Sequence, residues 1–495
     1  ESRESREVRT TVRSSAGADG SWERVEAVLD VAKGKPTEVC IELHPRSERP
    51  ADLQVGSVQL AYCPFKPADK PPPVAAFVRR VGSQLQQAGA PFVFLGADLW
   101  YGVQLAAAGA PAADRPRLLR ELDRLRAMGV RVLRVLAASE GDGSDGGRTI
   151  RPTLQPRAGE FDSRHLLGLD FLVSQAAARN LSLLLTLNNF WPWSGGFTQY
   201  LKWAGRLTDR TQEGGTARGD RDASASYSAL FYLNEEAMAM ADRTAAAIVT
   251  RTNAFTGTPY THEPAILGYE LCDGPLAMHS PEAYASWARR AAGKLRLLDS
   301  QHLITLGSAG RGVIPSVDHL DLRAEQLDDA IDFATVQLWP HEWGWAAAPA
   351  VSLAGSTLAP PNGATDRLDA VLQNASAYLQ AHVKLLVSAK HQERPLVLSA
   401  FGYPAESPSL RDEFFRRLLT LASQAIKKKN HGALVGSIFH GWAGEGRPRR
   451  ARWGEGDSLT GDPPADVQGL YSIYDTDGST IDVLRQHALA LRAHA

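Results

Sequence analysis

Short apolar runs of strand length alternate with longer segments of helical periodicity from Phe92 to the end of the chain. The predicted strands are Phe92–Leu95, Val130–Leu136, Ser182–Leu187, Ile266–Leu271, Leu303–Leu306, Phe333–Leu338, Leu396–Phe401 and Leu434–Phe439. The predicted helices are Arg115–Ala127, Leu166–Ala178, Glu235–Asn253, Glu282–Leu298, Leu368–Ala389, Leu410–Lys428 and a last one that begins at Ile481. This alternation predicts an α/β fold, a (β/α)8 barrel over residues 91–495.

A doubly wound parallel sheet is the main alternative to a barrel. Such sheets usually carry a glycine-rich phosphate loop directly after the first strand. No such loop follows Phe92–Leu95. The pattern therefore favours the barrel and gives no sign of a nucleotide cofactor.

Residues 1–72 have a different pattern, with short β-like runs separated by Gly, Pro and Asp turns. The runs are Glu7–Val12, Trp22–Val31, Thr37–Leu43 and Val55–Tyr62. They predict a small antiparallel β-rich domain, and the phrase Val55–Leu60 resembles the closing strand of jelly-roll carbohydrate-binding modules. Pro64–Pro73 is rich in proline, so residues 73–90 are expected to be a linker and connecting segment.

Composition excludes several classes of partner. Lys and Arg number 54 against 55 Asp and Glu, so the net charge of −1 provides no general attraction to nucleic acid. No run of about 18 apolar residues predicts membrane insertion, and the first residues do not resemble a signal peptide.

Three cysteines, Cys40, Cys63 and Cys272, lack the spacing of a metal site. Cys40 and Cys63 could pair in an oxidising compartment or remain free thiols. We expect no metal and no cofactor.

In a parallel barrel the chemistry lies where the strands end, so the residues closing each apolar run are the informative ones. These phrases include Leu187–Trp191, Tyr200–Gly205, Tyr269–Pro275, Ile331–Thr335, Arg394–Leu398, Gly444–Pro448, Gly461–Pro464 and Gln468–Asp477. Taken together and in this order, they resemble glycoside hydrolase family five, subfamily seven, the endo-β-1,4-mannanases. The resemblance covers the chain from about Phe92 onward. It implies a (β/α)8 barrel, a retaining mechanism on β-mannan, and an extracellular or secretory location.

A retaining glycosidase needs two carboxyl groups roughly 5 to 5.5 Å apart. In the family the acid is the Glu of an Asn-Glu-Pro phrase, whereas this chain has Asp273-Gly274-Pro275. The nucleophile is the Glu of a Glu-Phe-Gly phrase, whereas this chain has Ala400-Phe401-Gly402. Gly274 and Ala400 can neither donate a proton nor form a glycosyl ester, so the resemblance implies two vacant catalytic positions.

Neighbouring positions differ from the family as well. Gln337-Leu338-Trp339-Pro340 stands where the family has His-x-Tyr-Pro, and His440 stands where it has a platform Trp. A deliberate replacement explains Gly274 and Ala400 alone, while changes across the whole site favour natural loss of activity. The residues left for binding carbohydrate are Arg134, Asn188, Asn189, Trp191, Asp273, Gln337, Trp339, His440, Trp442 and Glu445. Each also has a simpler structural interpretation, in that Arg134 neutralises rim carboxylates and Trp442 packs in the core.

Three functions follow from this site. The first is a mannanase-like barrel without hydrolytic activity that serves as a structural or interaction module, within a larger protein or with protein partners in an assembly. The second is a lectin-like module that binds β-mannan or another polysaccharide without cutting it. The third is an active mannan endo-1,4-β-mannosidase with relocated carboxylates. A metal or new acid/base site built from His341, Glu342, Asp273 and His440 is a remote fourth hypothesis.

Overall fold

The structure is a computed structural model of the 495-residue chain. It describes residues 76–110, 112–143, 149–206, 218–310, 328–345, 364–388, 393–404, 408–427, 433–454 and 456–492. The predicted β-rich domain at residues 1–72, with Cys40 and Cys63, lies outside these ranges, so that prediction stays untested. The described residues all belong to one unit, within residues 67–495.

Eight parallel strands form the centre of this unit. They are β4 (Phe94–Asp98), β5 (Val132–Leu136), β6 (Ser182–Thr186), β7 (Ile266–Glu270), β8 (Leu303–Thr305), β9 (Ala334–Leu338), β10 (Leu396–Phe401) and β11 (Leu434–Phe439). Their order in the sheet is β8-β7-β6-β5-β4-β11-β10-β9. The predicted (β/α)8 barrel is confirmed.

Bonds between β8 and β9 bring the two outer strands of this sheet together. The Asp332 amide donates to the Ile304 carbonyl at 2.8 Å, and the Gln337 amide donates to the Ala309 carbonyl at 2.9 Å. The Thr305 hydroxyl donates to the Phe333 carbonyl at 2.8 Å. The sheet therefore closes on itself, and the carboxyl ends of all eight strands form one rim.

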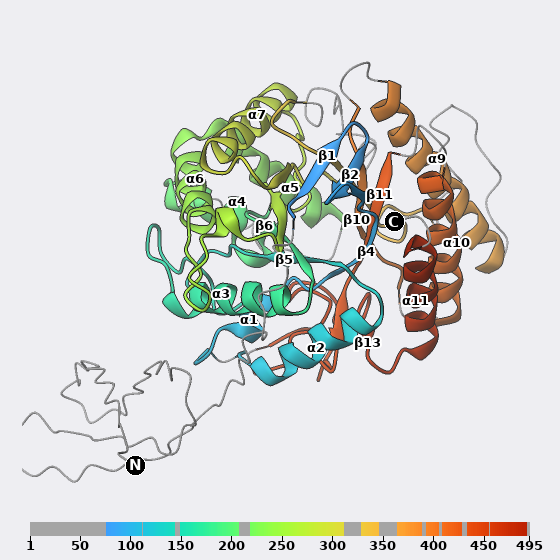
Figure 1. The fold of residues 1–495 in the computed structure, drawn as a ribbon. Helices are drawn as coiled ribbons and strands as arrows, with labels where there is room; N and C mark the ends of the chain where they lie inside the picture. The colour runs from blue at the N-terminus through green and yellow to red at the C-terminus, as the bar shows by residue number, and fades with distance from the viewer. Residues whose placement is uncertain are drawn as a thin grey trace, which may run out of the picture. The chain divides into compact units, whose positions relative to one another are not determined.

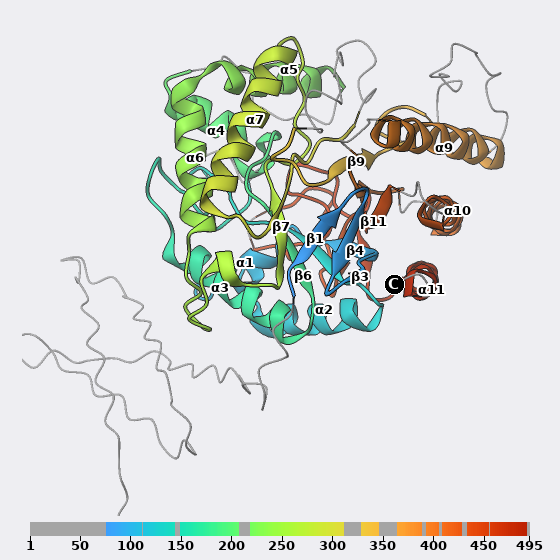
Figure 2. The same ribbon diagram turned by 45° about the horizontal axis from the view of Figure 1, so that its top comes forward.

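Helices surround the barrel (Figure 1). The helices of the described residues are α1 (Gly102–Ala106), α2 (Arg115–Ala127), α3 (Ser163–Ala178), α4 (Gly196–Trp203), α5 (Arg218–Ala229), α6 (Glu235–Val249), α7 (Pro281–Leu298), α9 (Ala364–Ser388), α10 (Pro408–Lys427) and α11 (Gly478–Arg492). Asp114 caps α2 and Asn234 caps α6 by accepting an amide hydrogen bond. In Figure 2, α9, α10 and α11 lie side by side as one layer outside β9, β10 and β11.

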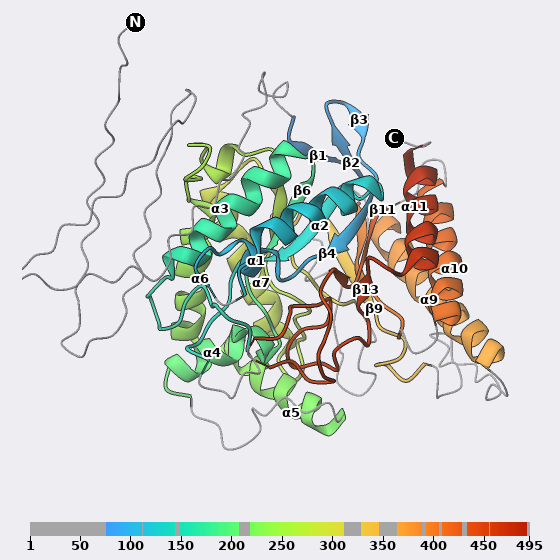
Figure 3. The same cartoon turned by 90° about the horizontal axis from the view of Figure 1, so that it is seen from below.

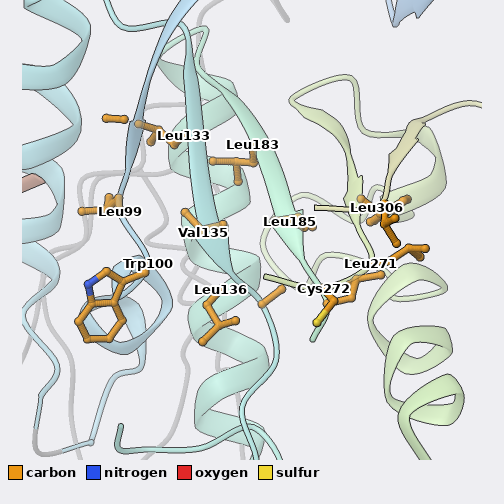
Figure 4. Close-up of a cluster of buried hydrophobic side chains, with 14 of the residues drawn as sticks. Leu99, Trp100, Leu133, Val135, Leu136, Leu183, Leu185, Leu271, Cys272 and Leu306 are labelled. Carbon is orange, nitrogen blue, oxygen red and sulfur yellow. The ribbon is translucent and has the colours of Figure 1, made fainter. Parts of the chain in front are cut away.

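The packed interior lies between the strands and these helices. Outward-facing side chains such as Leu133, Val135 and Leu185 are fully buried there (Figure 4). Leu136, Leu271 and Cys272 continue this cluster at the strand ends. Cys272 is therefore a buried thiol, and burial raises the pKa of its side chain.

A small antiparallel sheet closes the other end of the barrel. It consists of β1 (Val78–Val81), β2 (Gln84–Gln87) and β3 (Ala90–Pro91). Val78 and Leu85 of this sheet pack with inward-facing barrel residues such as Phe94. Figure 1 shows β1 and β2 lying across the barrel end. Part of the expected linker and connecting segment thus packs against the amino-terminal end of the barrel.

The predicted elements agree with the structure to within a few residues, and the first strand is shifted toward the carboxyl end. The apolar run predicts Phe92–Leu95, whereas β4 runs from Phe94 to Asp98. The strand ends in Gly96, Ala97 and Asp98, which an apolar pattern does not detect. The sequence pattern does not predict α1 and α4, which follow β4 and β6, or α5, which follows α4. In the described part of the chain, no helix is long and apolar enough to cross a membrane.

Candidate functional site

Arg134 is the centre of the barrel rim. It lies on β5, and its guanidinium is almost fully buried. The Nη2 atom donates to Asp273 Oδ1 at 2.6 Å, Nε donates to Glu270 Oε1 at 3.0 Å, and Nη1 donates to Asp98 Oδ2 at 3.3 Å. Three carboxylates, one at the end of β4 and two at the end of β7, therefore share one permanent cation.

Asp98 and His440 form a second contact at this rim. Asp98 ends β4, His440 follows β11, and β4 and β11 are neighbours in the sheet. His440 Nδ1 lies 3.0 Å from Asp98 Oδ2. The sequence pattern points to His440 but not to Asp98, and the signal for Asp98 is a carboxylate that closes a strand after two small residues, Gly96 and Ala97.

At the rim, burial and ion pairing have opposite effects on the pKa values of the charged side chains. Burial would raise the pKa of Asp98, but the hydrogen bond with His440 and the charge of Arg134 lower it below its ordinary value. For His440, burial opposes the charged form, yet Asp98 raises the pKa above the ordinary value. Burial raises the pKa of Glu270 despite its contact with Arg134. The Asp98–His440 pair therefore favours its charged state.

Gln337 connects the two positions where the resemblance implies catalytic glutamates. It faces Ala400 in the register of β9 and β10. A Cβ atom placed on Gly274 would lie 3.7 Å from Gln337 Nε2. The same Nε2 donates to Asp273 Oδ1 at 3.1 Å, while Gln337 Oε1 accepts a 2.9 Å bond from Trp339 Nε1. Gln337 thus neighbours both positions, Ala400 through the strand register and Gly274 through its amide group.

Trp191 also lies beside Gly274. A Cβ atom on Gly274 would come within 3.2 Å of Trp191 Nε1. Trp191 and Trp339 are both partly buried. Asn188 is 6% exposed, and its Oδ1 atom has no hydrogen-bond partner among the described residues. This part of the rim combines two indoles with an unsatisfied acceptor.

The side chain of Asn189 has a structural role. It is fully buried, and its side chain binds the Trp191 amide at 2.9 Å and the Ser194 hydroxyl at 3.0 Å. These bonds fix the loop on which Trp191 lies. Asn189 therefore supports the site rather than facing it.

Trp442 and Glu445 lie away from the rim residues. Trp442 is fully buried, and its Nε1 donates to Glu121 of α2 at 2.8 Å. Glu445 binds two arginines of the same helix, Arg120 at 2.7 Å and Arg124 at 2.6 Å. The hydrogen bond from Arg120 leads the effects that lower the pKa of Glu445 to about 2. Figure 3 shows the segment after β11 in red, near α2. The expectation that these two side chains contact carbohydrate is not supported by this placement, because their polar groups are already paired.

The hypothesis of a metal or a new acid/base centre has no support in the geometry. His341 and Glu342 are exposed in the turn after β9, and the contacts of His440 and Asp273 are those given above. No group of three or more His, Cys, Asp or Glu side chains in the described ranges is arranged to hold a metal ion.

The remaining carboxylates are poorly placed for glycoside hydrolysis. Glu270 has no exposed area and also accepts a 3.0 Å bond from Thr186. Asp273 is the most exposed of the three carboxylates at the rim, with 17% of its side chain exposed, but Arg134 and Gln337 both bind its Oδ1. A nucleophile and an acid must both reach the sugar, and only Asp273 is near enough to solvent to do so.

Comparison with known proteins identifies the family of this barrel. The profile described as "GH family 5 beta-mannosidase-like" matches residues 75–495. The chain belongs to glycoside hydrolase family 5. This family 5 barrel is similar to mannan endo-1,4-beta-mannosidase 5 of Solanum lycopersicum, with 27% identity over 384 residues, covering 73% of this chain and 80% of the relative. It is 26% identical to mannan endo-1,4-beta-mannosidase 1 of Oryza sativa subsp. japonica over 382 residues, which cover 73% of this chain and 77% of the relative.

Solved structures support the same family. The family 5 mannosidase from Rhizomucor miehei superposes with a TM-score of 0.72 at 25% identity, covering 84% of this chain and 98% of that one. A glutamate-to-alanine variant of that enzyme, in complex with mannosyl-fructose, gives a TM-score of 0.71 at 25% identity and covers 84% of this chain and 97% of that one. The mannanase-like nature of the family 5 barrel is thus shown, while subfamily seven stays a prediction.

Proposed function

We propose that this family 5 barrel does not hydrolyse mannosides and acts as a structural or interaction module. The observation that carries the proposal is that Gly274 and Ala400, which both neighbour Gln337, bring no carboxyl group to this part of the rim. If these are the family's acid and nucleophile positions, neither step of a retaining mechanism has a group to perform it. The carboxylates that remain are bound to Arg134 and cannot replace both.

The test is hydrolysis by the purified full chain. Galactomannan, glucomannan and an aryl β-mannoside serve as substrates, so that both internal and terminal cleavage are measured. We expect no reducing sugar and no aryl alcohol above a buffer control. Turnover that mannooligosaccharide inhibits would overturn the proposal. If Asp273→Asn then abolished it, the reaction would come from relocated carboxylates.

A second candidate function is binding of β-mannan without cleavage. It is favoured by the partly buried indoles of Trp191 and Trp339 and by the unsatisfied oxygens Asp98 Oδ1 and Asn188 Oδ1. Aromatic faces stack on sugar rings, and buried acceptors accept hydrogen bonds from sugar hydroxyls. Calorimetry with mannohexaose tests this candidate. Binding that Trp191→Ala removes supports a lectin-like module, and absence of heat leaves only the structural or interaction role.

A further inference from the structure

Glu140 is a buried carboxyl outside the rim network. It follows β5 by four residues and is 1% exposed. Its Oε2 accepts a 2.9 Å hydrogen bond from the amide of Gly196, the first residue of α4, and its Oε1 accepts a 2.9 Å bond from the Tyr200 hydroxyl on the same helix. No cation pairs with it in the described part of the chain.

These contacts attach one particular loop to the barrel. We call residues 188–196, between β6 and α4, the Trp191 loop. The Glu140 amide donates to the Ser194 carbonyl at 2.8 Å, so the backbone of Glu140 holds this loop as well as its side chain. Gly195 has a φ of +90°, and a Cβ atom there would lie 2.1 Å from the Glu140 carbonyl oxygen. The loop and Glu140 are therefore packed as closely as a glycine permits.

Both protonation states of Glu140 can satisfy the hydrogen bonds at this position. The Tyr200 hydroxyl also lies 3.0 Å from Thr244 Oγ1, which in turn lies 3.2 Å from the Met240 carbonyl. When Glu140 is ionised, Tyr200 donates to it. When Glu140 is protonated, it donates to Tyr200, Tyr200 donates to Thr244, and Thr244 donates to Met240.

We propose that Glu140 is a proton-dependent clasp, which holds the Trp191 loop closed most firmly while its carboxyl carries a proton. The ionised carboxyl loses hydration in the closed loop and gains no cation in return, whereas an opened loop would expose it to water. The other titratable groups near it are Tyr200 from α4 and the buried Cys272 after β7. The exposed Arg243 of α6 acts on Tyr200. None of these is a cation in contact with Glu140.

The direction of the pH effect follows from linkage. Burial raises the pKa of Glu140 from 4.5 to about 7 in the closed loop, and the open loop restores the ordinary value. Between pH 4.5 and about pH 7 the closed form binds more protons than the open form. Opening of the loop therefore increases as pH rises through this range and stops increasing above about pH 7. The open population should grow on the order of 100-fold between about pH 4.5 and pH 7.

Hydrogen exchange with mass spectrometry tests the clasp in the full chain. Peptides that cover residues 189–201 should show this increase in opening after the intrinsic pH dependence of exchange is divided out. Glu140→Gln keeps the shape and the protonated hydrogen-bond pattern, so its opening should not change with pH. Glu160→Gln, at an exposed glutamate, is the matched control and should keep the pH dependence of the unmodified chain.

Tyr200→Phe gives an independent result if Glu140→Gln does not fold. The Tyr200 hydroxyl stabilises the ionised carboxylate, so its removal should extend the pH dependence to higher pH. Opening that does not depend on pH in the unmodified chain overturns the proposal. The same pH dependence in Glu140→Gln would overturn it equally.

One consequence rests on the proposed sugar-binding role. Because Trp191 lies beside Gly274, any ligand stacked on its indole should bind more tightly at acidic pH. Exchange is measured without ligand, so failure of the clasp and failure of sugar binding are separate results.

Discussion

Arg134 donates a 2.6 Å hydrogen bond to Asp273, the carboxylate next to Gly274. Gln337 binds the same oxygen of Asp273 at 3.1 Å. Asp273 therefore serves as an anion that organises the rim, and its Oδ1 already accepts from two donors. The rim is stabilised as an ion network around Arg134 and Asp273.

Restoring both glutamates should return little activity. In Gly274→Glu with Ala400→Glu, residue 274 has a φ of +55°, a conformation that costs a non-glycine residue about 1–2 kcal/mol. Its Cβ would lie 3.2 Å from Trp191 Nε1. We expect mannoside hydrolysis at or near background in reducing-sugar and aryl-mannoside assays.

Gly274→Ala together with Ala400→Glu is the control for that experiment, since it carries the same backbone strain without the acid. Activity in the double glutamate variant that approaches that of an active family 5 mannosidase, with none in this control, would show that only the two carboxyl groups had been lost.

The sequence predicted the barrel well because its signal is periodic and repeated eight times. β10 and β11 match their predicted bounds, since both are continuous apolar runs with all side chains buried. The structure places Gly274, Ala400, Gln337, Trp339 and Asp273 near one another, because each lies at or just after the carboxyl end of a barrel strand.

The rest depended on contacts that a sequence does not contain. Asp98 was missed because its role comes from His440, which is 342 residues away. Trp442 and Glu445 were assigned to the site because they follow β11, yet both turn toward Glu121, Arg120 and Arg124 of α2. A strand end predicts proximity to the rim but not the direction of each side chain.

Arg134→Met should destabilise the protein strongly. It removes the one permanent cation shared by Asp98, Glu270 and Asp273, two of which are fully buried. Breaking a buried ion pair from one side costs about 3–5 kcal/mol. Urea unfolding should show a loss of this size in the free energy of unfolding.

Arg120→Met is the matched control, because Arg120 is half exposed and Glu445 keeps its contact with Arg124. The loss of stability in this control should stay below about 1 kcal/mol. Equal losses in the two variants would contradict the central role of Arg134.

His440 should titrate above the ordinary histidine pKa of 6.5, because its contact with Asp98 outweighs burial. A group whose pKa is raised by folding stabilises the protein fully below the unfolded value and loses this contribution as pH rises through the folded value. The free energy of unfolding contributed by His440 should therefore fall above about pH 6.5.

Proton NMR measures the midpoint of the His440 titration, with His440→Gln to assign the signal. In Asp98→Asn burial is opposed only by the smaller effects of Asp462 and Asp466, so the midpoint should drop below that of the unmodified chain. A midpoint that is unchanged in Asp98→Asn would mean that Asp98 does not set the protonation of His440.

Trp442 and Trp191 should give opposite results when each is replaced by Phe. Trp442→Phe leaves the fully buried Glu121 without its 2.8 Å donor and leaves unfilled volume in the core, so unfolding should cost about 2 kcal/mol less. The rim is unchanged in Trp442→Phe, so any heat of mannohexaose binding should persist.

Trp191→Phe changes a partly buried indole at the rim, so stability should change by less than about 1 kcal/mol while binding weakens. Urea unfolding and calorimetry on both variants distinguish a core tryptophan from a ligand-facing one. Loss of binding in Trp442→Phe without loss of stability would return Trp442 to the site.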